Sequence, residues 1–327
     1  MKRRDLLKFG SACFAAKALM SRGAVAQSKY PERPIKLVVP YAAGGVADIV
    51  GRLWADKMKS PLGSVFVENQ GSAGGSIIRS VGRANPDGYT LLSAGGPHIL
   101  MALAAPRDPA DPAPEVEPIS IVVVTAPVIA IHPSLPVQNL RDLIAYAKAG
   151  AGTVSYGSAA PGSMAHLTGE LFKLLIAAPD IVYVPYKGGG QSVADLVSGH
   201  IRIVTTNLTG QVLDLHRSGR IRVLAVTGPS RVAAAPDIPT AVEAGLPGMI
   251  AQNFIGLFAP AGIPKSIVMQ TSEATANAMA DNEFRRKLIA SGFEPYADSS
   301  PEGARRLIEE EFGRLSPVIK SIGLKLE

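Results

Sequence analysis

The residues of this chain that could do chemistry lie mostly in glycine-rich turns, each placed where an apolar strand should pass into a helix. The four turns read P-Y-A-A-G-G from Pro40, S-A-G-G from Ser72, Y-G-S-A-A-P-G-S from Tyr156 and Y-K-G-G-G from Tyr186. Glycine lets a ligand approach the backbone closely, and the free amides at the start of a helix attract a carboxylate, phosphate or sulfate. Singly, each turn could be a plain tight connection. Together they favour an anion-binding cleft.

Ser158, Ser163 and His166 form the one group that could supply a nucleophile and a base. Ser163 and His166 lie three residues apart at the expected start of a helix, so they share one face. A structural interpretation fits better, because serine is a preferred N-cap residue and His166 would then pack in the first turn. The sequence contains no G-x-S-x-G, H-E-x-x-H or G-x-x-x-x-G-K-[ST] motif. We therefore expect no catalytic residue, no metal and no cofactor.

The elements that must position these turns alternate along the chain. Apolar runs predict strands at 35–39, 64–68, 89–93, 122–131, 153–157, 181–185, 201–205, 223–227 and 254–260. Helical spacing predicts helices at 46–58, 77–83, 140–149, 163–176, 191–198 and 210–218. The remainder, 264–327, is predicted to be helical, most clearly at 282–290 and 301–315. The Pro-, Asp- and Ala-rich stretch 104–118 has no period and predicts a surface loop. Repeated strand-helix alternation indicates an α/β protein with mainly parallel sheets covered on both faces.

The length predicts two lobes. The chain has 327 residues, about twice a typical single domain. We expect the chain to cross between lobes near 126–132 and 252–260, and the C-terminal helices to pack back on the first lobe. Residues 27–127 and 253–327 would form domain 1, and residues 128–252 would form domain 2.

Residues 1–26 predict a cleaved export signal. A basic start is followed by a short apolar stretch from Phe9 to Met20 and by A-V-A-Q from Ala24. The apolar stretch is too short to span a bilayer as a stable helix. The Arg3-Arg4 pair favours the twin-arginine route. We expect a periplasmic protein that begins near Gln27; an amphipathic N-terminal helix is the alternative.

Removal of that signal changes the charge of the chain. Residues 1–26 hold six Lys or Arg residues and one Asp, a net of +5 out of the +6 of the whole chain. The remainder is close to neutral and has no basic cluster, which argues against nucleic-acid binding. The only cysteine, Cys13, lies in the same segment. The mature chain can therefore form no internal disulfide and has no cysteine for metal or nucleophilic chemistry.

The chain resembles the Bug family, the extracytoplasmic solute-binding receptors of tripartite tricarboxylate transporters. Eight segments carry the resemblance, in the same order. They read Y-P-E-R-P-I-K-L-V-V-P-Y-A-A-G-G-V-A-D-I-V from Tyr30, V-E-N-Q-G-S-A-G-G from Val67, N-P-D-G-Y-T-L-L from Asn85, A-P-G-S-M-A-H-L-T-G-E-L-F from Ala160, V-P-Y-K-G-G-G from Val184, L-A-V-T-G-P-S-R from Leu224, P-D-I-P-T-A-V-E-A-G-L-P-G from Pro236 and G-L-F-A-P-A-G-I-P from Gly256. The resemblance implies a type II periplasmic-binding-protein fold and no chemical reaction.

The resemblance also implies a ligand site. In such proteins a ligand carboxylate is held by the first glycine loop and by a loop of the second domain. The matching residues on one wall are Tyr41, Ala42, Ala43, Gly44, Gly45, Gly75 and Ser76, with Asp48 orienting the loop. Those on the opposite wall are Ser158, Ala160, Ser163 and His166, with Lys187 and Gly188 nearby. Asp48 and His166 could instead only brace their loops.

Three departures from the family pattern bear on specificity. The family usually has F-D-N-L where this chain has T-T-N-L from Thr205, so Thr206 replaces an acid beside Asn207, and both residues are assigned to the site. Ser76 and Ile78 stand where Asn and Gly are common, and the stretch after His98 lacks N-P-x-L-Y. Loss of the acid should ease binding of a second negative group or of a bulkier apolar body.

We therefore expect a monomeric receptor that captures a small organic carboxylate between its lobes, closes by hinge bending and delivers it to a membrane permease. A dicarboxylate, a tricarboxylate, an acidic amino acid and an aromatic acid all remain open. One alternative is a ligand-binding receptor for a two-component sensor kinase. Another is an exported serine hydrolase that uses Ser158 or Ser163 with His166.

Overall fold

The computed structural model describes residues 30–71, 74–104, 116–150 and 154–321. The predicted export signal lies outside the described residues. From Arg33 onward the chain forms one compact unit. No helix in the described ranges is both long and apolar enough to cross a membrane.

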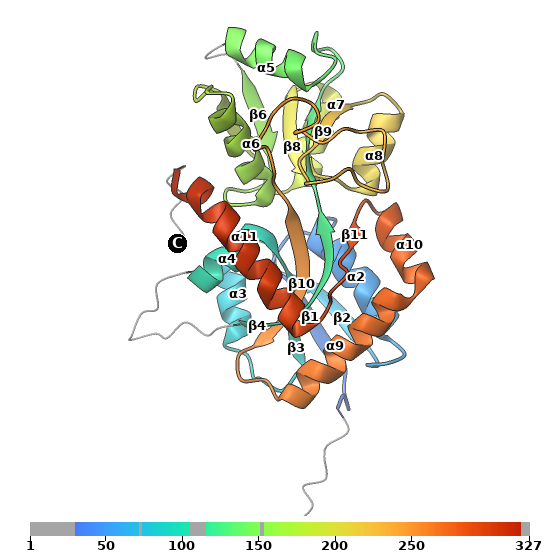
Figure 1. The fold of residues 1–327 in the computed structure, drawn as a ribbon. Helices are drawn as coiled ribbons and strands as arrows, with labels where there is room; N and C mark the ends of the chain where they lie inside the picture. Colours follow the sequence, from blue (N-terminus) through green and yellow to red (C-terminus); the bar gives the residue numbers. More distant parts are fainter. Residues whose placement is uncertain (1–29, 72–73, 105–115, 151–153, 322–327) are drawn as a thin grey trace, which may run out of the picture. The chain divides into compact units, whose positions relative to one another are not determined.

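The first sheet has six strands in the order β11-β4-β10-β3-β1-β2 (Figure 1). Its strands are β1 (Ile35–Val39), β2 (Val65–Asn69), β3 (Thr90–Ala94), β4 (Val116–Thr125), β10 (Asn253–Pro260) and β11 (Glu294–Pro295). The associated helices are α2 (Val46–Met58), α3 (Gly74–Gly82), α4 (Gly96–Ala104), α9 (Lys265–Ala280), α10 (Asn282–Ala290) and α11 (Pro301–Ser321). The fully buried rings of Trp54, Phe254 and Phe258 anchor this core.

The second sheet has five strands in the order β7-β6-β8-β5-β9. Its strands are β5 (Pro127–Ile131), β6 (Ser155–Ser158), β7 (Val182–Pro185), β8 (Ile203–Asn207) and β9 (Arg222–Val226). The associated helices are α5 (Leu140–Ala149), α6 (Met164–Leu175), α7 (Gly189–Ser198) and α8 (Gly210–Arg217). Two apolar clusters cover this sheet, one including Leu143 and Phe172 and the other including Leu196 and Val212.

A single residue separates the strands that lead the chain from the first sheet into the second. The apolar run predicted as a single strand over 122–131 is divided at Ala126, so that β4 belongs to the first sheet and β5 to the second. Proline at 127 has no amide hydrogen to continue a ladder, which accounts for a break at this point. Thr125 pairs with Asn253 on one side of the break, and Pro127 pairs with Asn207 on the other.

The α/β class, the two-lobed architecture and the mainly parallel direction of the strands are confirmed, with β10 and β11 in the first sheet and β5 in the second running opposite to the other strands. In the first sheet β1 is parallel to β2 and β3, whereas β10 is antiparallel to β3 and β4, and β11 is antiparallel to β4. In the second sheet β6 is parallel to β7 and β8, whereas β5 is antiparallel to β8 and β9. The antiparallel pairs come mainly from β5 and β10, which lie at the crossings between the two sheets. Both strands run opposite to those that alternate with helices.

The C-terminal helices pack on the first sheet, as expected, since α9 and α11 both contact β4 (Figure 1). Helix α11 also contacts α6 of the second sheet. Leu315 of α11 and Met164, the first residue of α6, belong to the same buried cluster. The C-terminal helix therefore joins both halves of the molecule.

Two elements were not predicted. Helix α4 is so apolar that it lacks an amphipathic period, and β11 is only two residues long. The predicted loop at 104–118 falls mostly outside the described residues, and Val116 to Pro118 already belong to β4.

Candidate functional site

The first glycine loop leads from the carboxyl end of β1 into α2. Ala42, Ala43 and Gly44 are exposed, and Gly44 has a φ of 81°, which glycine adopts at little cost. Gly45 is the N-cap of α2 and provides no side-chain cap. The first-turn amides of this helix therefore have no capping side chain, which leaves them available to an anion.

Asp48 braces this loop from the first turn of α2. It is only 4% exposed. Its Oδ2 accepts a hydrogen bond from the Gly44 amide at 2.8 Å, and its Oδ1 accepts from Arg52 Nε and Asn69 Nδ2, both at 2.9 Å. Arg52 Nη2 also donates to Asn69 Oδ1 at 2.8 Å. Burial raises the pKa of Asp48, but the bonds from Arg52, Gly44 and Asn69 together with the Arg52 charge lower it overall.

Tyr41 ties the same loop to the start of α4. Its hydroxyl donates to the Gly95 carbonyl at 3.3 Å, and its ring meets the His98 ring edge-on with 5.5 Å between centroids. Burial raises the pKa of Tyr41, so the phenol stays protonated. Burial also lowers the pKa of His98 to about 4, so this imidazole is neutral at neutral pH.

Gly71, which follows β2, lies against the first glycine loop. A Cβ atom placed on Gly71 would lie 3.1 Å from the amide nitrogen of Ala42. Gly75 and Ser76 follow in the first turn of α3, and Ser76 is exposed. The predicted residues of the first wall thus follow the carboxyl ends of β1 and β2, which are neighbouring strands of the first sheet.

On the second sheet, the loop after β6 is held by the start of α6. Ser163 is the N-cap of α6, and its hydroxyl accepts from the His166 amide at 3.2 Å. The Ser158 hydroxyl donates to the Ala159 carbonyl at 3.1 Å, and Ala160 is partly exposed between them. Neither serine hydroxyl is bonded to the imidazole of His166, so the geometry offers no nucleophile-base pair.

His166 is fixed from three directions. Its Nδ1 accepts from the Gly162 amide at 3.1 Å, which leaves the proton of the neutral ring on Nε2. Its ring stacks on Tyr183 at 4.2 Å between centroids, and Nε2 lies 3.9 Å from Glu170 Oε1. Burial lowers the pKa of His166; Glu170 partly opposes this effect and Lys173 adds to it. His166 therefore braces the loop between β6 and α6.

Two further turns of the second sheet complete the candidate residues. Lys187 is exposed, and Gly188 is the N-cap of α7 without a side-chain cap. Thr206 in β8 is buried, and its Oγ1 would lie 3.0 Å from a Cβ placed on Gly189. Thr206 thus lies beside the start of α7, which directly follows Lys187 and Gly188 in sequence.

Asn207 connects the two groups of site residues. Its Oδ1 accepts from Asn253 Nδ2 at 3.4 Å. The Asn253 carboxamide lies against Gly96 at the start of α4, next to the Gly95 carbonyl that Tyr41 contacts. A chain of contacts therefore runs from the first glycine loop to the end of β8.

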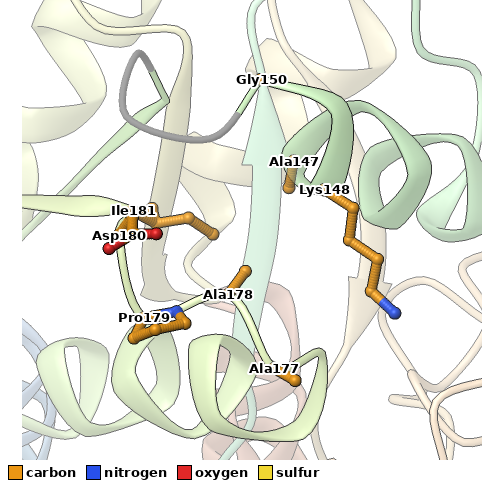
Figure 2. Close-up of a pocket in the computed structure, with 8 residues that line it drawn as sticks. All are labelled: Ala147, Lys148, Gly150, Ala177, Ala178, Pro179, Asp180 and Ile181. Carbon is orange, nitrogen blue, oxygen red and sulfur yellow. The ribbon is translucent and has the colours of Figure 1, made fainter.

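A small pocket lies elsewhere on the second sheet. It encloses about 100 Å³ between the end of α5 and the segment that enters β7 (Figure 2). The lining residues are Ala147, Lys148, Gly150, Ala177, Ala178, Pro179, Asp180 and Ile181. They precede β7, whereas Lys187 and Gly188 follow it. This pocket is therefore at the opposite edge of the sheet from the glycine turns.

Comparison with known proteins identifies the family. Residues 50–324 match the family model described as the tripartite tricarboxylate transporter family receptor. This chain belongs to that receptor family. Its members are substrate-binding receptors and not enzymes, so the hydrolase alternative is wrong and the expectation of a non-enzymatic receptor is confirmed.

Relatives of this receptor include proteins of known structure. It is 33% identical to protein BugT of Bordetella pertussis over 307 residues, which are 93% of each chain. It is 31% identical to the periplasmic binding protein BugD, with a TM-score of 0.80 over 90% of this chain and 99% of that one. It is 32% identical to Rpa4515 of R. palustris, solved with adipate, with a TM-score of 0.82 over 90% and 98% of the two chains. The resemblance to the Bug family is confirmed.

Several residues that hold the loops were not singled out from the sequence. Arg52 follows Asp48 by one helical turn, and that spacing was a usable signal. Asn69 lies 21 residues from Asp48, on β2, and Tyr183 lies on β7, far from His166 in sequence. Only the folded arrangement reveals those two partners.

Proposed function

We propose that this receptor binds a small organic carboxylate between the first glycine loop and the loop that precedes α6. The observation that carries the proposal is the start of α2, where backbone amides without a capping side chain are held in place by a buried, fully bonded Asp48. Such a helix start favours an anion. The adipate bound by Rpa4515 supports a carboxylate as that anion.

The second wall would add donors from the other sheet. The loop between β6 and α6 is held by Ser163 and His166, and Lys187 adds an exposed positive charge near the start of α7. A ligand that touches both walls would stabilise a closed arrangement, with bending at the single residue between β4 and β5. The domain division at 127/128 and 252/253 is part of this proposal.

The family also suggests the partner of this receptor and its cellular location. We infer that the mature receptor is a periplasmic monomer, exported by removal of residues 1–26, and that it hands its ligand to the membrane permease of a tripartite tricarboxylate transporter. The family description and the periplasmic relative BugD support this inference. The family description favours a permease over a sensor kinase as the partner.

Isothermal titration calorimetry on the chain from Gln27 tests the proposal. The panel would contain succinate, adipate, citrate, glutamate and benzoate, and the matched control for each acid that binds is the amide in which every carboxylate is replaced by a carboxamide. We expect at least one carboxylate to bind and its amide to fail, because the site is selective for negative charge. Binding of neutral solutes only, with no carboxylate bound, would overturn the proposal.

A further inference from the structure

Asp48 presents an electrostatic problem for an anion site. Its carboxylate is buried in the first turn of α2, the same turn whose amides would hold the ligand. An unbalanced negative charge there would repel a carboxylate through a low-dielectric environment. Something in the molecule must cancel this charge if the start of α2 is to attract an anion.

Arg52 supplies the compensating charge. Its Nε lies 2.9 Å from Asp48 Oδ1, and its Nη2 bonds Asn69, which in turn donates to the same Asp48 oxygen. Asn69 Nδ2 also lies 3.3 Å from the Tyr41 carbonyl oxygen of the glycine loop. Arg52, Asp48 and Asn69 thus form a closed ring of hydrogen bonds beneath the loop.

The other groups facing this part of α2 do not replace Arg52. On the elements packed against α2, Glu68 of β2 pairs with Lys36 of β1, and Asp281 at the start of α10 pairs with Lys57 at the far end of α2. Thr275 of α9 is uncharged and bonds Trp54. His98, behind Tyr41, is neutral at neutral pH. Within the described part of the chain, Arg52 is the charged group that acts on the Asp48 carboxylate.

We propose that Arg52 is a positioning residue of the ligand site: it cancels the charge of Asp48 and fixes the first glycine loop, so that the start of α2 attracts an anionic ligand. This role rests on the proposed carboxylate-binding function. Arg52 need not touch the ligand, since its guanidinium is engaged by Asp48 and Asn69. It acts through the charge balance of the helix start.

Three variants separate this role from a purely structural one. Arg52→Gln removes the charge, and Asp48→Asn combined with Arg52→Gln removes both charges while keeping an oxygen for the Gly44 amide. Lys59→Gln is the matched control, because it removes a positive charge from the exposed end of the same helix, where Lys59 pairs with Asp56. Thermal unfolding of each variant establishes that it is folded before its affinity is measured.

The probe is the carboxylate that binds the wild type most tightly, measured by calorimetry at neutral and at mildly acidic pH. We expect Arg52→Gln to weaken binding about tenfold at neutral pH, since half-exposed Arg52 acts partly through water. The loss should shrink at acidic pH, because the buried Asp48 carboxylate takes up a proton more readily once Arg52 no longer lowers its pKa. The double variant should regain affinity. Lys59→Gln should bind as the wild type does.

These results distinguish failure of the proposed carboxylate-binding function from failure of the proposed role of Arg52. If the wild type binds no carboxylate, the proposed function fails and this role fails with it. If the wild type binds and Arg52→Gln binds equally well, only the role of Arg52 is overturned. It is also overturned if the double variant binds as weakly as Arg52→Gln at both pH values, because charge balance would then not explain the loss.

Discussion

Burial of His98 beside the first glycine loop predicts a specific loss of stability in acid. Burial lowers the pKa of this imidazole from 6.5 to about 4. Between those two values the unfolded chain binds a proton that the folded chain does not, so stability falls as pH falls through that range. The difference corresponds to about 3 kcal/mol, since each pH unit contributes about 1.4 kcal/mol.

The perturbation that isolates this contribution is His98→Phe. Phenylalanine keeps a ring against Tyr41, where the two rings now lie 5.5 Å apart, but it cannot take up a proton. Urea unfolding followed by circular dichroism at pH about 7 and about 4 gives the free energy of unfolding for both proteins. The wild type should lose about 3 kcal/mol more than His98→Phe on acidification.

Comparing the acid-induced loss in the free energy of unfolding between the wild type and His98→Phe cancels any effect of the substitution that is the same at both pH values. It also cancels the contribution of the carboxylates and of the other histidines, because both proteins contain them. Equal acid losses in wild type and variant would refute the reasoning. They would show that His98 is hydrated in the folded state or is protonated there without cost.

Three substitutions test the packing that positions the site, each by the free energy of unfolding in urea. Gly95→Ala should cost more than about 3 kcal/mol or prevent folding, because its methyl group would overlap the Phe254 carbonyl oxygen; a mild effect would contradict that close approach. Met164→Ala should cost about 2–5 kcal/mol, because Met164 is 3% exposed and shares a buried cluster with Leu315 of α11; a neutral result would argue against α11 joining the two halves. Gly313→Ala, at an exposed position of α11 with no atom near the new methyl group, should stabilise the protein by about 0.8 kcal/mol, and destabilisation would indicate an unseen neighbour.

Secondary structure and turns were largely predictable from the sequence. The bounds of α2, α5 and α10 match the expected ranges, because each helix combines periodic apolar residues with clear end signals in its flanking residues. The turns at the ends of β1 and β6 were likewise predictable from their glycine content. Such signals are local, so one sequence is enough to read them.

Features set by distant contacts were not predictable. The crossing near 126–132 was expected, but the apolar run gave no sign that it is divided at Ala126 into two strands that belong to different sheets. The antiparallel pairing of β10 depends on how the chain returns from the second sheet. The ring formed by Asp48, Arg52 and Asn69 depends on the register of β2 beside β1, which a single sequence does not specify.

The central claim is that turns from both sheets hold one carboxylate. A crystal structure of the chain from Gln27 with the tightest-binding acid of the calorimetry panel tests it most directly. The account predicts one carboxylate group within hydrogen-bond distance of the first-turn amides of α2 and of the segment Ser158 to Ser163, directly or through one water. A ligand held by only one of these segments, or one seated in the pocket beside α5, would contradict it.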